Sequence, residues 1–181
     1  MRIVAGVWAE RRLTSPGGRV RPTHEAVRIL WMDHLAPHLP GARILDLFAG
    51  TGALGLEALS RGAAAVDFVE SGGEALHALK ANVAALKVRP LGRGQRPSAE
   101  NRSARIFKQD AIPFVQRLEA GAYDLAFADP PYGSLKLDRI IERWQAIPFA
   151  SILVAEHAAD HVVATGQARL TYEDTVLTVY R

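Results

Sequence analysis

The chain has 181 residues, of which 49% are hydrophobic and 23% charged, and a formal net charge of +3. This length is enough for one domain with a substantial core, and the absence of cysteine excludes a disulfide framework and a thiolate metal site. The N-terminal segment has no long apolar stretch, and no apolar run reaches membrane-spanning length. We therefore expect a cytoplasmic protein that has neither a membrane nor a metal as a partner.

The first 40 residues are predicted to form a short N-terminal extension with a hairpin and a helix. Ile3–Trp8 is typical of an edge strand. Thr23 is suited to cap a helix that reaches about His34, because its hydroxyl can accept a hydrogen bond from a free backbone amide of the first helical turn.

From residue 43 onward, short β-rich runs alternate with helical patterns, which predicts a parallel sheet covered by helices. The predicted strands are Arg43–Leu47, Ala65–Val69, Ala104–Phe107, Tyr123–Ala128 and Ser151–Ala155. The predicted helices are Gly52–Arg61, Gly73–Lys87, Ile112–Glu119 and Leu135–Ile147. The C-terminal runs Arg169–Glu173 and Thr175–Tyr180 alternate polar and apolar residues, which predicts a closing β-hairpin with its bend at Glu173-Asp174.

Positive charge is concentrated in two segments. Residues 1–43 carry a net charge of +4 and residues 87–108 a net charge of +6, so the remainder carries −7. Two basic segments on an acidic body are typical of a protein that binds a polyanion such as a nucleic acid. Solvated arginine-rich loops are the alternative, and Arg89–Arg102 is the best candidate for such a loop.

A glycine-rich turn follows the first predicted strand of the alternating region. Gly50, Gly52 and Gly55 fit the dinucleotide pattern G-x-G-x-x-G, and Glu70 stands at the position of a ribose-binding acid, so NAD is one candidate ligand. Asp46 argues against NAD, because a carboxylate in this place repels a pyrophosphate but suits a ligand with an ammonium group. S-adenosylmethionine has an ammonium group, a sulfonium and no phosphate, and we favour it.

Asp110 follows the third predicted strand of this region. Its carboxylate is expected at the carboxyl edge of the sheet, where it can accept hydrogen bonds from the amino group of the cofactor's adenine. The alternative is that Asp110 caps the helix that follows it, and the two roles are compatible.

The run Asp129-Pro-Pro-Tyr132 ends the fourth predicted strand of this region. A base amine is a poor nucleophile because its lone pair is delocalised into the ring. Asp129 and the Pro130 carbonyl can accept hydrogen bonds from such an amine, and the prolines hold that carbonyl rigidly. Tyr132 offers a flat face for an extruded base. The alternative is that Pro130 and Pro131 only end the strand.

Two other groups of residues invite a functional interpretation. His157 and His161, with Glu156 beside them, resemble a metal pair, but without a third ligand or an H-E-x-x-H pattern we expect no metal site. The three tryptophans are predicted to be packing residues.

Taken together, these motifs resemble the bacterial 16S ribosomal RNA guanine-N2 methyltransferases of the RsmD type. The matching stretches are Met1–Gly6, Arg21–Thr23, Val27-Arg28, Leu45–Gly62, Val69-Glu70, Asn82, Asp110, Asp129–Tyr132 and Tyr172–Thr175. Three features depart from the family pattern: Ile29 replaces a usual acid, Glu173 replaces a usual glycine, and the basic stretch Arg89–Arg105 is longer than usual.

The resemblance implies an α/β fold of the Rossmann-like, class I S-adenosylmethionine-dependent methyltransferases. It has a mostly parallel seven-stranded sheet with a C-terminal antiparallel hairpin. We expect one domain over residues 1–181, with the extension in 1–40 and the catalytic core in 41–181. The implied substrate is a guanine of 16S rRNA, and the implied partner is an assembled or partly assembled small ribosomal subunit.

Site residues are carried over by motif. The cofactor would be lined by Thr23, Asp46, Phe48, Ala49, Gly50 and Gly52, with Glu70 on its ribose and Asp110 near its adenine. Asp129, Pro130, Pro131 and Tyr132 would hold the target guanine.

Two other functions stay open on the sequence. An adenine-N6 DNA methyltransferase would use Asp129–Tyr132 equally well, although no separate target-recognition domain is evident. A non-catalytic RNA-binding assembly module is the other alternative.

Overall fold

The computed structural model describes residues 1–15, 25–92, 95, 97–98 and 100–181. Thr23, Arg21, Arg93 and Arg96 lie outside the described residues. The predicted cofactor contact and helix cap at Thr23 are therefore not placed by the structure.

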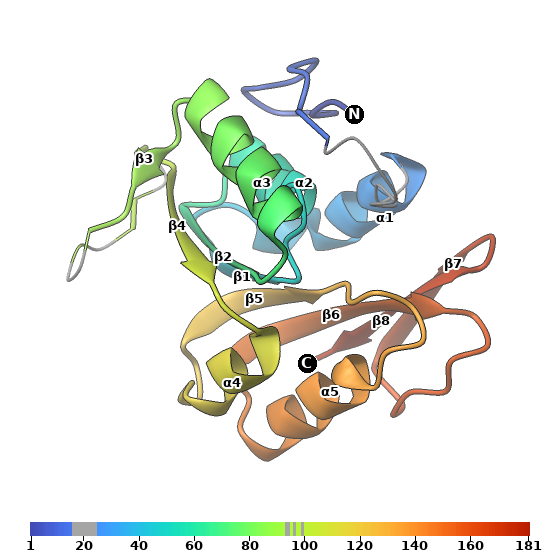
Figure 1. Cartoon of the computed structure of the whole chain (residues 1–181). Coiled ribbons are helices and arrows are strands. Elements are labelled where there is room, and N and C mark those ends of the chain that lie inside the picture. Colours follow the sequence, from blue (N-terminus) through green and yellow to red (C-terminus); the bar gives the residue numbers. More distant parts are fainter. Residues whose placement is uncertain (16–24, 93–94, 96, 99) are drawn as a thin grey trace.

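The described residues form an eight-stranded sheet in the order β3-β4-β2-β1-β5-β6-β8-β7 (Figure 1). The strands are β1 (Arg43–Leu47), β2 (Ala65–Glu70), β3 (Arg89–Pro90), β4 (Ser103–Lys108), β5 (Tyr123–Ala128), β6 (Ala150–Ala158), β7 (Ala168–Tyr172) and β8 (Thr175–Tyr180). The six strands β3, β4, β2, β1, β5 and β6 are parallel to their neighbours in this order, whereas β8 pairs antiparallel with both β6 and β7. Each strand predicted from residue 43 onward is confirmed, as is the closing hairpin.

The predicted number of seven strands is wrong. The additional strand β3 has only two residues, which pair with Ser103 and Ala104 at the start of β4. A two-residue strand that contains proline has no alternating pattern, so the sequence indicates only a loop at this position.

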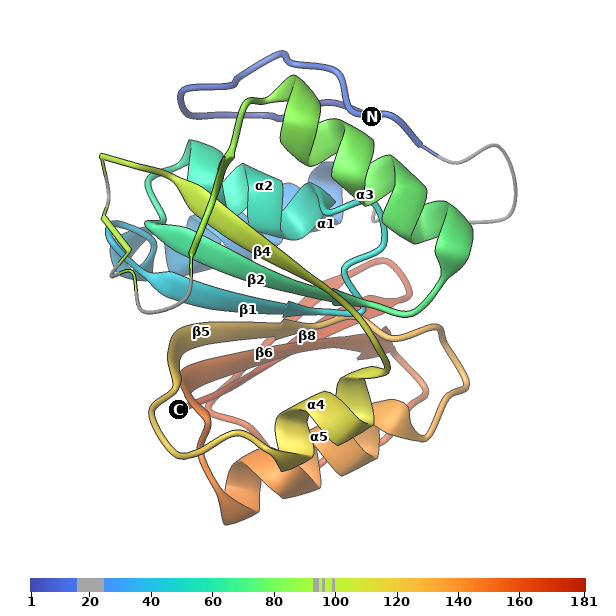
Figure 2. The ribbon, with the colours of Figure 1, turned by 60° about the vertical axis from the view of Figure 1, so that its left-hand side comes forward.

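Five α-helices and a 3-10 turn are present among the described residues. They are α1 (Glu25–Leu35), η1 (Ala36–His38), α2 (Ala53–Ser60), α3 (Gly73–Ala85), α4 (Ala111–Gln116) and α5 (Lys136–Ala146). Helices α1, α2 and α3 cover one face of the sheet, and α4 and α5 cover the other (Figures 1 and 2). In the described part of the chain, no helix has the length and apolar character needed to span a membrane.

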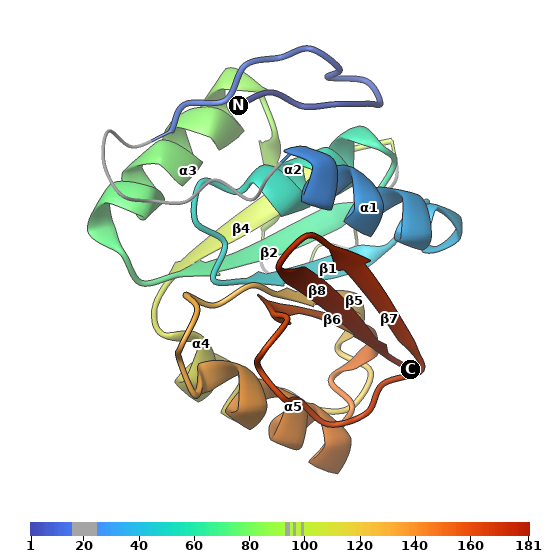
Figure 3. The same cartoon turned by 90° about the vertical axis from the view of Figure 1, so that its right-hand side faces the viewer.

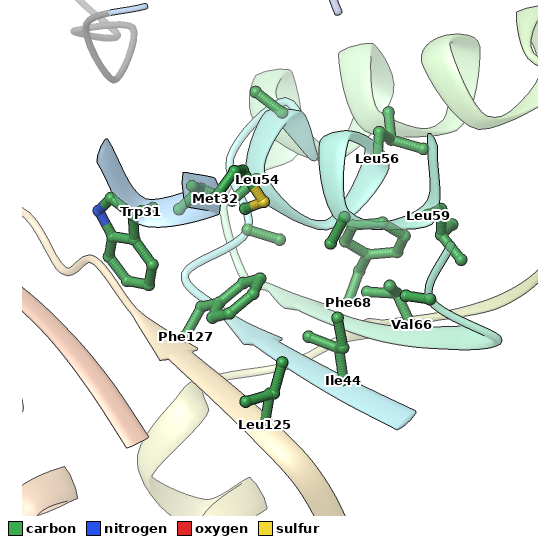
Figure 4. Close-up of a cluster of buried hydrophobic side chains, with 14 of the residues drawn as sticks. Trp31, Met32, Ile44, Leu54, Leu56, Leu59, Val66, Phe68, Leu125 and Phe127 are labelled. Atoms are coloured by element: carbon green, nitrogen blue, oxygen red, sulfur yellow. The ribbon is translucent and has the colours of Figure 1, made fainter. Parts of the chain in front are cut away.

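Each face of the sheet packs against its own group of apolar side chains. On the side of α1 to α3, Ile44, Phe68 and Phe127 from three strands meet Trp31 and Met32 from α1 (Figure 4). Their neighbours along the strands point to the opposite face and form a second cluster with α4 and α5. This alternation of side chains fixes which residues of each strand can reach a ligand on a given face.

The predicted edge strand Ile3–Trp8 is wrong. The first 13 residues instead run over α2 and α3, with a single isolated bridge between Arg2 and Arg12 (Figure 3). The amides of Val4 and Ala5 donate to the Glu57 carboxylate, at 2.7 and 2.9 Å. A side chain of α2 therefore accepts the hydrogen bonds that a neighbouring strand would accept.

Glu57 joins the N-terminal segment to α2 through a buried ionic cluster. Its carboxylate is fully buried and lies 2.9 Å from Arg61 Nε and 3.6 Å from Arg28 Nε. Arg28 is also fully buried, and its Nη2 donates to the backbone carbonyl of Arg2 at 2.6 Å. A buried charge is tolerated only when it is paired, so Arg28 depends on Glu57.

Replacement of Glu57 tests this dependence. Glu57→Gln should lower the free energy of unfolding by about 3–5 kcal/mol, because it leaves the buried Arg28 guanidinium without a counter-charge. Asp33→Asn removes the exposed partner of Arg61 and should change the free energy of unfolding by less than about 1 kcal/mol. Urea denaturation of both variants measures the difference, and equal effects would contradict the structural role of Glu57.

Candidate active site

A cavity of about 530 Å³ opens at the carboxyl ends of the parallel strands. It brings together the residues after β1, the end of β2 and the segment after β5. Its lining includes the predicted site residues Asp46, Phe48, Ala49, Gly50, Glu70, Asp129, Pro130, Pro131 and Tyr132. Two motifs that are about 80 residues apart in the sequence thus meet at one edge of the sheet, where ligands of open α/β sheets bind.

Acidic side chains form a row along this edge. Among the described residues, the cavity lining contains four carboxyl groups, those of Glu70, Asp46, Asp129 and Glu156. They come from β2, β1, the residue after β5, and β6, which are neighbours in the sheet in that order. Within their strands they alternate with residues of the opposite face, so all four belong to the face covered by α1 to α3.

The glycine turn after β1 is held by hydrogen bonds to Glu70, at the end of the neighbouring strand β2. Glu70 accepts the amide hydrogen of Gly50 at 2.8 Å with one carboxylate oxygen and that of Gly72 at 2.6 Å with the other. Gly52 has a φ of +80°, and a Cβ atom there would lie 2.4 Å from Leu79 Cδ1. The turn therefore needs glycine at position 52, although Gly52 itself does not line the cavity.

Asp46 is a buried acid with an unusual pKa. It is 2% exposed, and its Oδ2 accepts the amide hydrogen of Gly55 at 3.0 Å. Burial raises the pKa of Asp46 to about 8, and the charges of Asp129 and Glu70 act in the same direction. A cation bound in the cavity would favour the ionised form of Asp46.

The Asp129–Tyr132 segment forms the opposite wall. Asp129 is half-buried and Pro130 is buried, whereas Tyr132 is 41% exposed at the cavity. The Tyr132 hydroxyl lies 3.0 Å from Thr175 Oγ1 and donates to Glu156 Oε1 at 3.3 Å. These bonds hold the ring from its hydroxyl end and leave part of its surface open.

The structure places Asp110 as the cap of α4. Its Oδ1 accepts the amide hydrogen of Ile112 at 2.9 Å, which confirms the capping alternative. Its other oxygen pairs with Lys136, and this hydrogen bond is the main cause of the lowered pKa of Asp110. Asp110 is not among the residues that line the cavity, whereas its partner Lys136 is.

Sequence patterns did not identify several residues of the cavity wall. Glu156, Thr175 and Lys136 line it, and Trp31 Nε1 donates to Glu156 Oε2 at 3.2 Å. The signal for Glu156 is its position in β6, where it follows the apolar residues Ile152 and Val154 on one face.

The histidines near Glu156 have other partners. His157 bonds Thr178 Oγ1 through Nε2 at 2.9 Å, and His161 lies 3.2 Å from the Asp138 carboxylate. Across the residues that the structure describes, no group of three or more His, Asp or Glu side chains is arranged to hold a metal ion.

The chain was compared with known proteins. Residues 1–174 match the family described as Conserved hypothetical protein 95. YlbH of Bacillus subtilis is 33% identical over 87% of this chain and 82% of its own length. Ribosomal RNA small subunit methyltransferase D of Escherichia coli is 36% identical over 73% of this chain, a match that spans 60% of that protein's length.

The chain belongs to the RsmD-type methyltransferase family.

The solved structures agree with this membership. The structure of yhhF from Escherichia coli superposes with a TM-score of 0.79 at 30% identity and covers 99% of this chain and 96% of its own. SMU.776, solved as a complex with SAH, shares the fold at a TM-score of 0.56 and 18% identity, over 85% of this chain and 48% of its own. The predicted family and the class I methyltransferase fold are confirmed.

The buried acid of this RsmD-type protein makes ligand binding depend on pH. Asp46 is protonated in the free protein below about pH 8, so a ligand with an ammonium group must displace that proton. Affinity for S-adenosylhomocysteine should therefore rise from pH 6 to 8 by up to about tenfold per pH unit. Calorimetry across this range measures it.

Two variants test the cause. Asp46→Asn should bind more weakly and lose this rise, because no carboxyl group remains to ionise. Glu74→Gln, which changes an exposed acid of α3, should keep the wild-type profile. An unchanged profile in Asp46→Asn would show that another group titrates.

Proposed function

We propose that this protein transfers a methyl group from S-adenosylmethionine to the exocyclic N2 amine of a guanine in 16S ribosomal RNA. The observation that carries the proposal is the single cavity in which the glycine turn of β1 and the Asp129–Tyr132 segment face one another. Family membership supports the reaction class, and the name of the Escherichia coli relative supports the small-subunit substrate.

The residues of the cavity fit the cofactor. Asp46 is a buried carboxyl group with a raised pKa, so a nearby cation favours its ionised form, and the ammonium and sulfonium groups of S-adenosylmethionine can supply one. Glu70, at the end of β2, is proposed to accept hydrogen bonds from the ribose hydroxyls, and Phe48, Ala49 and Gly50 to line the ligand. When bound, the cofactor supplies an electrophilic methyl group.

Asp129 and the Pro130 carbonyl act on the target amine. Both are acceptors at the end of β5, so both hydrogens of an exocyclic amine can be bound while its nitrogen faces the cofactor. Pro131 restricts the backbone next to this carbonyl and so preorganises the acceptor. The half-exposed ring of Tyr132 offers a stacking surface for a base taken out of its helix.

Asp110 is proposed to lie near the adenine of the cofactor. Its partner Lys136 lines the cavity, which places the Asp110 carboxylate next to the cavity wall. The oxygen that faces Lys136 can accept an additional hydrogen bond, because a carboxylate oxygen has two lone pairs. The proposal for Thr23 as a cofactor contact rests on the family motif alone.

The partner is proposed to be an assembled or partly assembled small ribosomal subunit in the cytoplasm. The two basic segments of the sequence support RNA binding. They meet at the Arg102 guanidinium, which lies 5.9 Å from the centre of the Trp8 ring, and the first segment continues from there to the cavity. Ser15, which follows exposed Arg11 and Arg12, lines the cavity. Strand β3 instead pairs with the start of β4, so the basic connection between them begins at the opposite end of the sheet (Figure 2).

Several cations of the second segment are engaged within the protein. Arg105 pairs with Asp67, and Arg102 donates to the Leu59 carbonyl at 2.9 Å. We therefore propose that Arg11 and Arg12 contact RNA beside the cavity, with the β3–β4 connection as a second, more distant contact.

Loss of Asp129 should abolish methyl transfer. A strain that lacks this protein should lack one N2-methylguanosine in 16S rRNA, which the wild-type gene restores and Asp129→Ala does not. Affinity of Asp129→Ala for S-adenosylhomocysteine should stay within a few-fold of wild type, because the carboxylate acts on the amine. Mass spectrometry of nucleosides from 16S rRNA and genomic DNA measures the modification.

This experiment also separates the alternatives. A missing N6-methyladenine in DNA would establish the DNA methyltransferase instead. If no modified nucleoside changes, the non-catalytic assembly module becomes the better explanation.

Loss of Arg11 and Arg12 should weaken RNA binding and its dependence on salt. Each lost phosphate contact should make the slope of log K against log salt shallower by about 0.7–0.9. A charge-matched control is Arg117→Ala with Arg169→Ala, two exposed cations outside both basic segments, and its slope should equal that of wild type. A shallower slope in the control alone would contradict the proposed contact at Arg11 and Arg12.

A further inference from the structure

The carboxylate of Glu156 is built into the cavity wall, and neither the glycine turn nor the Asp129–Tyr132 segment includes it. Glu156 is only 5% exposed, yet it belongs to the cavity lining. Trp31 Nε1, which can only donate, bonds one oxygen at 3.2 Å, and the Tyr132 hydroxyl donates to the other at 3.3 Å. Both oxygens of Glu156 therefore act as acceptors.

The sheet places Glu156 beside Asp129. Strands β5 and β6 are parallel neighbours, and Ala128 pairs with Ala155. Asp129 and Glu156 each follow one member of this pair. Strand β1 lies on the other side of β5, so Glu156 is on the far side of Asp129 from Asp46 and the glycine turn. It belongs to the part of the cavity that the proposed function assigns to the target base.

Neighbouring side chains hold the Glu156 carboxylate in place. The Trp31 ring packs edge-on against Phe127, with 5.1 Å between centroids (Figure 4). Thr175, from β8, lies 3.0 Å from the same Tyr132 hydroxyl that bonds Glu156. The carboxylate is thus fixed by residues of α1, β8 and the Asp129–Tyr132 segment.

The chemistry of the bases gives this arrangement a use. Guanine presents its N1–H donor next to its N2 amine, whereas adenine presents an N1 acceptor next to its N6 amine. A fixed acceptor beside Asp129 would bond the first and repel the second. A carboxylate oxygen has two lone pairs, so an oxygen that already accepts one hydrogen bond can accept a second.

We propose that Glu156 accepts the N1–H of the target guanine and is the residue that makes this site select guanine over adenine. The inference rests on the proposed function. It assigns the choice of base to Glu156, while the acceptors on the reacting amine, Asp129 and Pro130, are the same for either base.

The test compares guanine with 2,6-diaminopurine, which keeps the N2 amine but has an acceptor at N1. Small subunits are reconstituted with 16S rRNA carrying either base at the position that nucleoside mapping identifies. The ratio of kcat/KM for the two substrates is measured for wild type and for Glu156→Gln. The glutamine amide can still accept from Trp31 but can also donate to N1.

Wild type should prefer guanine by at least about 100-fold, since a site built to bond an N–H rejects analogues that lack it. In Glu156→Gln this preference should fall by at least about tenfold, a change of 1.4 kcal/mol. Affinity for S-adenosylhomocysteine should stay within about twofold, because Glu156 lies away from the glycine turn. The change between variants cancels the effect of the different group at C6.

A second variant separates base selection from anchoring. Trp31→Phe removes the indole N–H and keeps the Glu156 carboxylate, so turnover should fall while the preference for guanine is retained. If Glu156→Gln lowers turnover on both substrates equally, Glu156 has only a structural role and the inference is overturned. If wild type methylates no guanine of 16S rRNA, the proposed function itself fails.

Discussion

The alternation of side chains in parallel strands that are in register is the constraint on which this protein depends. Because successive side chains point to opposite faces, an acid can reach the cavity only at every second position of a strand. Glu70, Asp46, Asp129 and Glu156 all satisfy this requirement on neighbouring strands. Slipping one strand by a single residue would turn its acid into the apolar layer under α4 and α5.

The same constraint explains what the sequence could predict of the fold. Strands such as β1 and β5 are short, apolar and bounded by turn residues, so their ends were predicted to the residue. The N-terminal segment has a similar local pattern, but the Glu57 carboxylate, more than 50 residues away, takes its amides. Local periodicity carries no information about such a distant competitor. Strand β3 was missed for another reason, because its two residues are too few to show any periodicity.

The residues of the site likewise fall into those that local sequence patterns reveal and those that depend on the order of the strands. The glycine turn and the Asp129–Tyr132 segment are each continuous in sequence, so local patterns reveal them, and the two together indicate a methyltransferase site. Glu156 acquires a role only when β6 is placed next to β5, and Thr175 only when β8 is placed next to β6. Trp31 acquires one only when α1 packs on this face of the sheet and its indole reaches Glu156. Sheet order is a long-range property, so these residues could be found only after the strands were arranged.

The acidic lining has a consequence for turnover. Methyl transfer converts a sulfonium into a neutral thioether, so the ligand loses a positive charge while the carboxyl groups around it stay in place. On the proposed function, the carboxyl groups that line the cavity therefore attract the product less strongly than the methyl donor, because Coulomb attraction scales with charge. The ammonium group is kept in both, so Asp46 still has a cation to pair with after the methyl group has gone.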